Sequence, residues 1–350
     1  MVGAPPPARR SGRRACGVLT AGAEVPMFGN AEEKYVIPDG GHTRVVVLGG
    51  TGFVGRHVCA AFVDEGREVV AVSRRAEPAG PGVLPLALDL CATAPAALAR
   101  VLTDGRPTTV VNAAGAVWAA SEREMVTANT ELVRRLVDAL CRAEPPVRLV
   151  HLGSVNEYSP GRQGRPVDES APTRPTTVYG RTKLRGTELV LDAAGRGDID
   201  ALVLRMANVA GPGSPPASLL GRVAQQLHLA SLEGRTAEIR LAPLRAARDF
   251  VDAADAGAAV SAAARSSVGA RVLNIGSGEA VSVRSLVDLL IRVSGVPARV
   301  VETPPAPDVA AAPPEWLEVD VRLARQLLGW APQRQLTHAV AGLWRALADR

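Results

Sequence analysis

Short apolar runs alternate with longer segments of helical periodicity along most of this chain. The runs are rich in β-branched residues and are apolar at consecutive positions, which indicates strands buried on both faces. Predicted strands cover 44–48, 68–73, 83–88, 108–113, 147–152 and 201–206, and predicted helices cover 53–66, 95–102, 121–142 and 177–194. Strands separated by helices predict an α/β protein with a doubly wound parallel sheet of the Rossmann type.

After residue 206 the pattern becomes less regular. Helices are predicted at 219–230, 252–266, 282–293, 321–328 and 336–347, with strands at 238–241 and 272–275. We therefore predict a dinucleotide-binding core at 43–207, to which 248–276 returns. A smaller, discontinuous substrate-binding lobe at 208–247 and 277–350 would lie over the carboxyl edge of the sheet, where such folds bind ligands. Residues 1–42 are predicted to be a disordered leader, with a transit peptide as the alternative.

Composition narrows the classes of function. Hydrophobic residues at 47% and charged residues at 21% are typical of a soluble globular protein, and no apolar run is long enough to span a membrane. The net charge of +5 is small, and the densest group of arginines (Arg9, Arg10, Arg13 and Arg14) lies in the leader, so we expect no nucleic-acid partner. The four scattered cysteines and five histidines form no metal-ligand pattern, which predicts no metal and a reducing cytoplasm.

The first strand runs directly into a glycine-rich turn. Gly49, Gly52 and Gly55 stand three residues apart between this strand and the first helix. Glycine lets the main chain turn tightly and approach a ligand, and a helix N-terminus offers free N–H groups to a phosphate. In a strand–turn–helix context this spacing predicts a seat for a dinucleotide diphosphate.

Tyr179 and Lys183 are four residues apart on a predicted helix and therefore share one face. A nearby ammonium group would lower the pKa of the phenol and make it a usable acid and base. The alternative is a half-buried tyrosine beside a solvated lysine. Leu152-Gly-Ser154 lies at the carboxyl end of the predicted strand that precedes this helix, so the Ser154 hydroxyl could polarise a carbonyl next to the phenol.

Together these motifs resemble the extended short-chain dehydrogenases/reductases, in the group of NAD(P)-dependent nucleotide-sugar epimerases, dehydratases and ketoreductases. The resemblance covers residues 44 to 345. It rests on Gly49-x-x-Gly52-x-x-Gly55, Asp89-Leu90, Asn112-Ala-Ala-Gly115, Ser154, Tyr179-x-x-x-Lys183, Arg205-x-x-Asn208-Val-x-Gly-Pro-Gly213, Arg248-Asp-Phe250, Asn274-Ile-Gly276 and Leu328-Gly-Trp330-x-Pro332.

The resemblance implies a role for each matched residue. Ser154 would hydrogen-bond the reacting oxygen, Tyr179 would exchange the proton, and Lys183 would hold the nicotinamide ribose and tune Tyr179. The substrate would contact Asn156, Asn208 and Arg248, the last two at its diphosphate; the alternatives are a turn role for Asn208 and a surface position for Arg248. The cofactor would be held by Gly49, Thr51, Gly52, Phe53, Val54, Gly55, Ser73, Arg74, Arg75, Asp89, Leu90, Asn112, Ala113, Ala114, Gly115 and Lys183.

The residues after the second strand predict the cofactor. An acidic side chain there would bind the ribose 2′-hydroxyl of NAD(H) and repel a 2′-phosphate. Here the strand ends Ser73-Arg74-Arg75, and forked guanidinium groups suit a phosphate. We therefore predict NADP(H), with NAD(H) as the alternative if both arginines are merely surface residues.

The sequence also departs from the family in two places. Dehydratases of this group carry Asp-Glu directly after the active-site hydroxyl residue, whereas this chain carries Val155-Asn156. Glu157 is the nearest carboxyl, and it would face away from Asn156 if the chain stayed extended. The segment 303–308 lacks the arginine that sugar-nucleotide enzymes usually supply there, which weakens the prediction of a nucleotide-diphosphate substrate.

These features lead to a functional expectation. We expect an NADP-dependent ketoreductase of a nucleotide-activated (dTDP or UDP) 4-keto-6-deoxy sugar, with Tyr179 as the proton donor. The alternatives are an NDP-sugar 4-epimerase with the same Ser/Tyr/Lys set, a reductase of a non-sugar ketone, and a cofactor-binding protein without activity. By analogy, a homodimer would pair the 121–142 segment and the helix that carries Tyr179.

Overall fold

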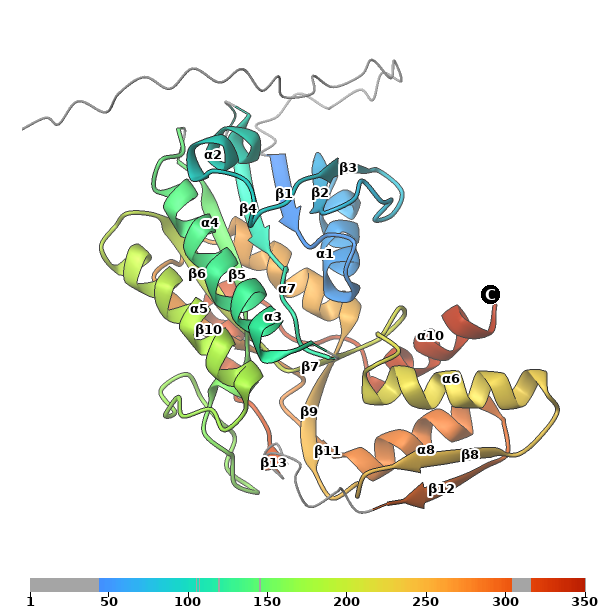
Figure 1. The fold of residues 1–350 in the computed structure, drawn as a ribbon. Helices are drawn as coiled ribbons and strands as arrows, with labels where there is room; N and C mark the ends of the chain where they lie inside the picture. Colours follow the sequence, from blue (N-terminus) through green and yellow to red (C-terminus); the bar gives the residue numbers. More distant parts are fainter. Residues whose placement is uncertain are drawn as a thin grey trace, which may run out of the picture. The chain divides into compact units, whose positions relative to one another are not determined.

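The computed structural model describes residues 44–349, apart from 105, 107, 119, 145 and 304–315. The predicted leader therefore lies outside the described residues. The described part contains a parallel sheet of seven strands in the order β10-β6-β5-β4-β1-β2-β3 (Figure 1). Its strands are β1 (Arg44–Leu48), β2 (Val69–Ser73), β3 (Val83–Ala87), β4 (Thr108–Asn112), β5 (Arg148–Ser154), β6 (Asp200–Met206) and β10 (Arg271–Ile275).

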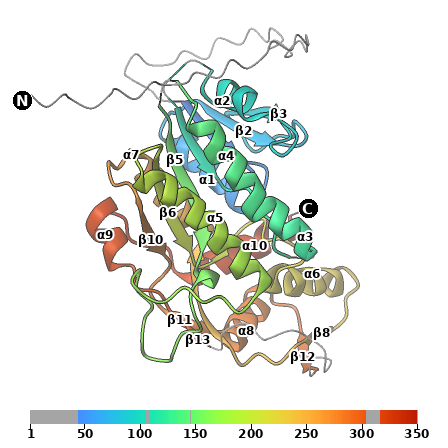
Figure 2. The ribbon, with the colours of Figure 1, turned by 60° about the vertical axis from the view of Figure 1, so that its left-hand side comes forward.

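Helices cover both faces of this sheet because its central strands are buried at nearly every position (Figures 1 and 2). On one face, strand residues pack with α1 (Phe53–Asp64) and α7 (Ala253–Arg265) in one apolar cluster. On the other face, they pack with α2 (Pro95–Thr103), α4 (Leu132–Leu140) and α5 (Val178–Gly195). The predicted doubly wound α/β architecture is confirmed.

The strand order reverses at β1. From β1 the chain moves outward to β2 and β3, and then it crosses back to place β4 on the other side of β1. Because all these strands are parallel, their carboxyl ends meet at one edge of the sheet. In such folds the point of reversal at this edge is where ligands bind.

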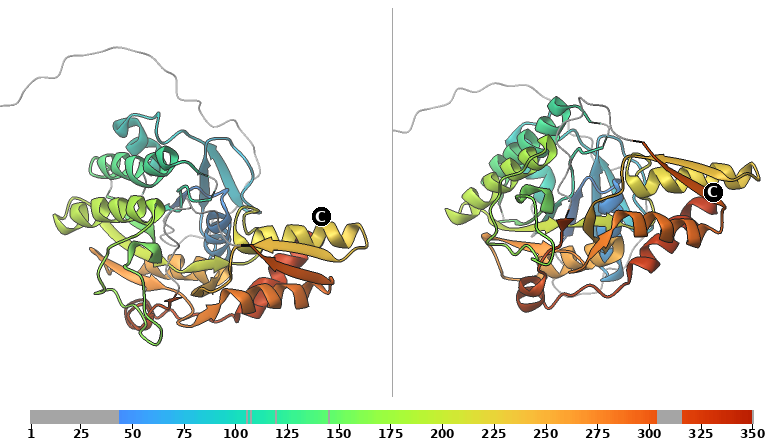
Figure 3. Two further views of the ribbon diagram at one scale, coloured as in Figure 1. Left: turned by 60° about the horizontal axis from the view of Figure 1, so that its bottom comes forward. Right: turned by 90° about the horizontal axis from the view of Figure 1, so that it is seen from below.

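A third apolar cluster lies beside the sheet (Figure 3). Strand β8 (Ala237–Leu241) pairs in parallel with β12 (Ala298–Glu302), and α6 (Leu219–Leu232), α8 (Val283–Ser294) and α10 (Leu336–Ala348) pack around them. These segments come from both predicted parts of the substrate lobe. Residues 41–350 nevertheless form one unit by their contacts, so the division into core and lobe stays a prediction.

Five short strands were missed by the sequence pattern. One is β12. The other four form a small mixed sheet: β7 (Asn208–Ala210), β9 (Ala247–Asp252), β11 (Ala280–Ser282) and β13 (Trp316–Leu317). Helix α9 (Arg322–Leu328) follows β13 in the chain and packs against the large sheet. For β9 the reason is visible in its sequence. This strand buries the charged Asp249 completely, so its residues show no clear apolar alternation. Burial of a charge depends on partners that are distant in sequence.

The predicted continuous helix at 121–142 is wrong in detail. It consists of α3 (Glu122–Val126), a π-helical turn at Thr127–Glu131, and α4. The turn places Asn129 inside the protein, where its side chain donates to Ala116 O and accepts from Ala116 N, both at 2.9 Å. A π turn of this kind often marks a functional position in a helix.

Candidate active site

The glycine turn between β1 and α1 has the shape that a diphosphate seat requires. Gly49 has a φ of 75°, and a Cβ atom on it would come within 2.9 Å of Ala114 Cα. A Cβ on Gly55 would lie 2.1 Å from Gly49 O, so the helix can start this close only with glycine there. Gly52 caps α1 without any side chain, which leaves the helix N-terminus open to a ligand. The turn therefore fits a dinucleotide.

The residues predicted for the adenosine end lie along the same edge. Arg74 and Arg75 are exposed at the end of β2, and Arg75 makes a surface contact with Glu77 at 3.7 Å. Both guanidinium groups can therefore turn towards a phosphate. Asp89 accepts the N–H groups of Cys91 and Ala92, so its carboxylate shapes the loop after β3, and the neighbouring Leu90 is buried.

Asn112 is the last residue of β4, and its side chain connects this strand to β5 and to the loop that follows. It is fully buried, its amide contacts His151 Nδ1 at 3.1 Å, and its oxygen accepts the N–H of Ala114 at 3.2 Å. Asn129, which the sequence analysis missed, holds the following residues through Ala116 and also donates to Thr182 Oγ1 at 3.1 Å. A Cβ on Gly115 would come within 2.9 Å of Asn129 Oδ1. This loop is thus tied to α5.

Ser154 is held by the residue that was expected to contact substrate. Its Oγ accepts two hydrogen bonds from Asn156, one from the main-chain N–H at 3.2 Å and one from the side-chain amide at 3.1 Å. Ser154 is buried at the carboxyl end of β5. With both bonds accepted, the hydroxyl hydrogen is free to be donated to another oxygen.

Helix α5 brings Tyr179 next to Ser154. The helix is capped by Thr177, and a Cβ on Gly180 would lie 2.2 Å from Asn156 O, so the first turn of α5 packs directly on the residues after Ser154. Burial raises the pKa of Tyr179 to about 12, and a hydrogen bond from Ser154 partly offsets this rise. Tyr179 is therefore protonated at neutral pH, and the expected lowering of its pKa by Lys183 is not found.

Lys183 lies one helical turn further along α5 and is almost completely buried. Its ammonium group donates to the main-chain oxygen of Leu152 in β5. Burial lowers the pKa of Lys183 to about 8, while the charge of Glu157 acts in the opposite direction. A large part of the lysine therefore stays charged near neutral pH, beside Tyr179 and Ser154.

Glu157 does not lie where an extended chain would place it. Residues Val155–Glu157 form a 3₁₀ turn, which directs the Glu157 side chain into the protein. There it is fully buried and forms an ion pair with Arg205 Nε at 2.7 Å. The carboxylate is thus engaged within the chain, behind Ser154.

The two residues expected at the substrate diphosphate differ in their surroundings. Asn208 donates its amide to Asp249 O at 3.0 Å, which agrees with a structural role for this side chain. Arg248 lies beside it on β9, mostly inside the protein, and its Nε is buried without a hydrogen-bond partner among the described residues. Burial lowers the pKa of Arg248. It is not a surface arginine, and it is suited to binding an anion.

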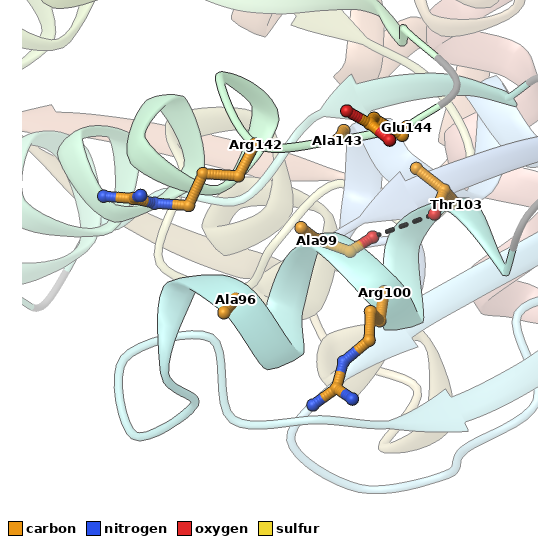
Figure 4. A pocket seen from close by; sticks show the side chains of 7 residues that line it. All are labelled: Ala96, Ala99, Arg100, Thr103, Arg142, Ala143 and Glu144. Atoms are coloured by element: carbon orange, nitrogen blue, oxygen red, sulfur yellow. Dashed lines mark hydrogen bonds between the residues drawn. The ribbon is translucent and has the colours of Figure 1, made fainter. Parts of the chain in front are cut away.

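A pocket of about 190 Å³ lies elsewhere, at the opposite edge of the sheet (Figure 4). It is lined by residues along α2 and by residues 142–144, which follow α4 and lead towards β5. Its Thr103 hydroxyl bonds Ala99 O in its own helix at 3.1 Å. This pocket therefore belongs to the amino edge and not to the Ser154 cluster. Within the described part of the chain, no helix has the length and apolarity needed to cross a membrane.

Comparison with known proteins gives consistent matches over most of the chain. A model of the NAD dependent epimerase/dehydratase family matches residues 45–276. The chain is 46% identical over 305 residues to dTDP-6-deoxy-L-talose 4-dehydrogenase (NAD(P)(+)) of Kitasatospora kifunensis, which covers 87% of this chain and 95% of that protein. It is 29% identical over 315 residues to UDP-glucose 4-epimerase of Azospirillum brasilense, covering 83% and 87%. The solved structure of MoeE5 in complex with UDP-glucuronic acid and NAD has a TM-score of 0.73 and 29% identity, covering 87% and 98%.

Proposed function

Because this chain belongs to the NAD-dependent epimerase/dehydratase family and is an NAD(P)-dependent oxidoreductase of the extended short-chain type, we propose that it is a ketoreductase. Its substrate would be a nucleotide-activated 4-keto-6-deoxy sugar, which it would reduce at C4. The observation that carries this proposal is the hydrogen bond between Ser154 and Tyr179, which places two hydroxyl donors side by side for one carbonyl oxygen.

The donors have the protonation states that reduction needs. The glycine turn and Lys183 would hold the nicotinamide cofactor, which would supply a hydride to the carbonyl carbon when bound. Ser154, whose oxygen is occupied by Asn156, donates its hydrogen to the carbonyl oxygen as negative charge develops there. Tyr179, protonated because its pKa is raised to about 12, transfers its proton to the same oxygen.

Dehydration is disfavoured by the residues after Ser154. Elimination of water from a hexose needs an additional base and acid next to the nicotinamide. Val155 cannot titrate, the Asn156 amide cannot exchange a proton near neutrality, and Glu157 is paired with Arg205. We therefore expect no loss of water when the protein is incubated with dTDP-glucose and NAD⁺. Mass spectrometry would detect the 4-keto-6-deoxy product, and its formation would falsify the assignment.

Arg248 supports a substrate that carries a diphosphate. A buried guanidinium nitrogen without a partner has an unfavourable free energy that an anionic ligand would relieve. The relative from Kitasatospora kifunensis is named for a dTDP-activated 6-deoxy sugar oxidised at C4, which is the reverse of the proposed direction. We accordingly favour dTDP over UDP as the nucleotide.

NADP(H) is the proposed cofactor, with NAD(H) as the alternative. Arg74 and Arg75 are exposed at the end of β2 and form no strong ion pair with the described residues, since the Arg75–Glu77 contact is long and solvent-exposed. Guanidinium forks in this place suit a 2′-phosphate. The diphosphate would occupy the glycine turn at the start of α1, and Lys183 would hold the nicotinamide ribose.

A 4-epimerase is the second candidate, because a relative with 29% identity is a UDP-glucose 4-epimerase. An epimerase oxidises and then reduces the same sugar, so it keeps its nicotinamide bound. Absorbance of the purified protein separates the two candidates: retained nicotinamide favours the epimerase, whereas a protein that consumes added NADPH favours the reductase. Assays with a panel of dTDP- and UDP-linked keto sugars test the proposal. If no member of the panel is reduced, the ketoreductase assignment fails.

We also propose that the protein is cytoplasmic and forms a homodimer through α3, α4 and α5. Light scattering of the purified protein tests the dimer, and a monomer at working concentration would contradict it.

A further inference from the structure

Glu157 makes three hydrogen bonds inside the protein, and each reaches a different element. Oε1 accepts from the main-chain N–H of Ser154 at 2.7 Å and from Thr187 Oγ1 at 3.0 Å. Oε2 accepts from Arg205 Nε at 2.7 Å. Ser154 ends β5, Thr187 belongs to α5 and Arg205 lies on β6. One buried carboxylate thus links the strand that carries Ser154 to the helix that carries Tyr179 and Lys183.

The ion pair is itself held from the other side. Arg205 lies over the ring of Tyr158, with its guanidinium carbon 4.5 Å from the ring centre. The Tyr158 hydroxyl donates to Asn274 Oδ1 on β10 at 2.8 Å. Gly153 leaves room for this carboxylate. Any larger residue at this position would place a Cβ atom only 2.8 Å from Glu157 Oε1. These contacts give Glu157 a single position.

We propose that Glu157 is a positioning residue for the proposed reduction, which fixes the Ser154 hydroxyl against Tyr179 by holding the Ser154 main chain to α5. The inference rests on the proposed function for its catalytic consequence. A buried carboxylate that only neutralised Arg205 would not need to accept the Ser154 N–H. Displacement of a catalytic group by about 1 Å can reduce a rate about 100-fold, so this anchoring should matter for turnover.

The charge of Glu157 also acts on Lys183. The groups around Lys183 are His151 on β5, Tyr179 on α5 and Glu157 in the 3₁₀ turn. His151 is buried and its pKa is well below its ordinary value, so it is neutral and adds no charge near pH 7. Glu157 raises the pKa of Lys183 against the effect of burial. Removal of this carboxylate charge should therefore lower the pKa of Lys183.

Two substitutions separate geometry from charge. Glu157→Gln keeps the shape but replaces one acceptor by an N–H₂ group, which must face a donor of Arg205 or of Ser154. Glu157→Asp keeps the charge but shortens the side chain, so it cannot reach all three donors. Asp255→Asn is the matched control, because Asp255 is a buried carboxylate that accepts two main-chain N–H groups and pairs with Arg334 away from Ser154.

The measurements are kcat for a reduced keto sugar, the Kd for NADPH, and the pKa of Lys183. The chain contains only two lysines, Lys34 and Lys183, so ¹³Cε-lysine NMR resolves this titration directly. We expect both Glu157 variants to lose about 10- to 100-fold in kcat with NADPH affinity within about twofold. The Lys183 pKa should fall in Glu157→Gln and stay near that of the wild type in Glu157→Asp. Asp255→Asn should keep both kcat and the Lys183 pKa.

The inference is overturned if a folded Glu157 variant keeps kcat within about twofold, or if Asp255→Asn loses as much. If Glu157→Gln does not fold, Thr187→Val takes its place, since it removes one bond to the carboxylate and keeps the side-chain shape; unchanged kcat there also overturns the inference. If the wild type reduces no keto sugar, the proposed function fails. The lysine titration needs no substrate and still tests the inferred role of Glu157. A Lys183 pKa that does not change in Glu157→Gln contradicts this role.

Discussion

Replacement of Lys183 by Met should make the protein more stable in the absence of nucleotide. Lys183 is buried, and its only hydrogen bond within the described residues runs to Leu152 O. Methionine is of similar length and apolar, so it can fill the same space without a charge. The substitution removes a group that is required for the proposed activity and that burial disfavours in its charged form.

The size of the effect follows from the pKa. The folded protein lowers the pKa of Lys183 from 10.5 to about 8. At 1.36 kcal/mol for each unit, the charged lysine destabilises the folded state by about 3 kcal/mol at neutral pH. Loss of the bond to Leu152 O opposes the gain by about 1 kcal/mol. A net increase of about 2 kcal/mol in the free energy of unfolding is expected.

The pH dependence has a definite sign. Because the folded pKa is below the unfolded one, the destabilisation is complete below about pH 8 and is lost as the pH rises towards 10.5. In this window the unfolded chain holds the proton and the folded protein does not, so the wild type gains stability relative to the variant. Tyr179 acts in the opposite direction only above its ordinary pKa of 10. Measurements between about pH 7 and about pH 9 therefore isolate Lys183.

Urea unfolding of both proteins, free of nucleotide, measures this difference. The advantage of Lys183→Met should shrink by about 1 kcal/mol from about pH 7 to about pH 9. The lysine resonance that disappears in the variant should titrate near pH 8 in the wild type. A variant that is no more stable than the wild type at neutral pH, or an advantage that does not change with pH, would refute the reasoning.

Three further predictions concern activity. Tyr179→Phe should keep its fold and NADPH affinity but lose at least about 100-fold in kcat, more than Ser154→Ala loses; retained turnover would remove Tyr179 as proton donor. Arg74→Ala/Arg75→Ala should raise the KM for NADPH far more than that for NADH in steady-state assays, and equal effects would contradict a 2′-phosphate site. Arg248→Met should raise the KM for the dTDP sugar at least about tenfold with little change for NADPH, because only the substrate loses its charge-assisted bond. An unchanged sugar KM would rule out Arg248 as a diphosphate ligand.

The sequence was sufficient for the core of the fold because its strands follow a simple rule. Strands such as β1 and β6 have consecutive apolar residues, at 45–48 and 201–204, and are separated by helices, so their parallel pairing could be predicted. Ser154, Tyr179 and Lys183 could be found for a similar reason: the first ends a strand, and the other two are one helical turn apart. These relations are local, and a single sequence contains them.

What could not be predicted depends on contacts between distant segments. Glu157 is buried because Arg205, 48 residues later, supplies the opposite charge. The pKa of Tyr179 rises because α5 is packed against the end of β5, although the neighbouring lysine alone suggested a lower value. Strand β9 escaped detection because Asp249 is buried and accepts N–H groups from Ser277 and Gly278. In each case a polar residue lies inside for a reason that its own segment does not contain.

Buried polar groups without partners point to the same edge of the sheet as the sequence motifs do. Among the described residues, Arg44 and Arg148 also have a buried Nε without a hydrogen-bond partner, but Arg44 Nε lies 3.6 Å from Glu68 Oε1, and each arginine bonds elsewhere through another guanidinium nitrogen. Arg248 differs, since its side chain forms no hydrogen bond or ion pair with another residue that the structure describes. It lies on β9, two residues before Phe250, which pairs with Asn208, and Asn208 lies two residues after the carboxyl end of β6. Arg248 on β9 and Lys183 on α5 are both desolvated cations, and each costs the folded protein stability. Bound anionic ligands can restore this stability. This favours a binding site over a purely structural role for the cluster.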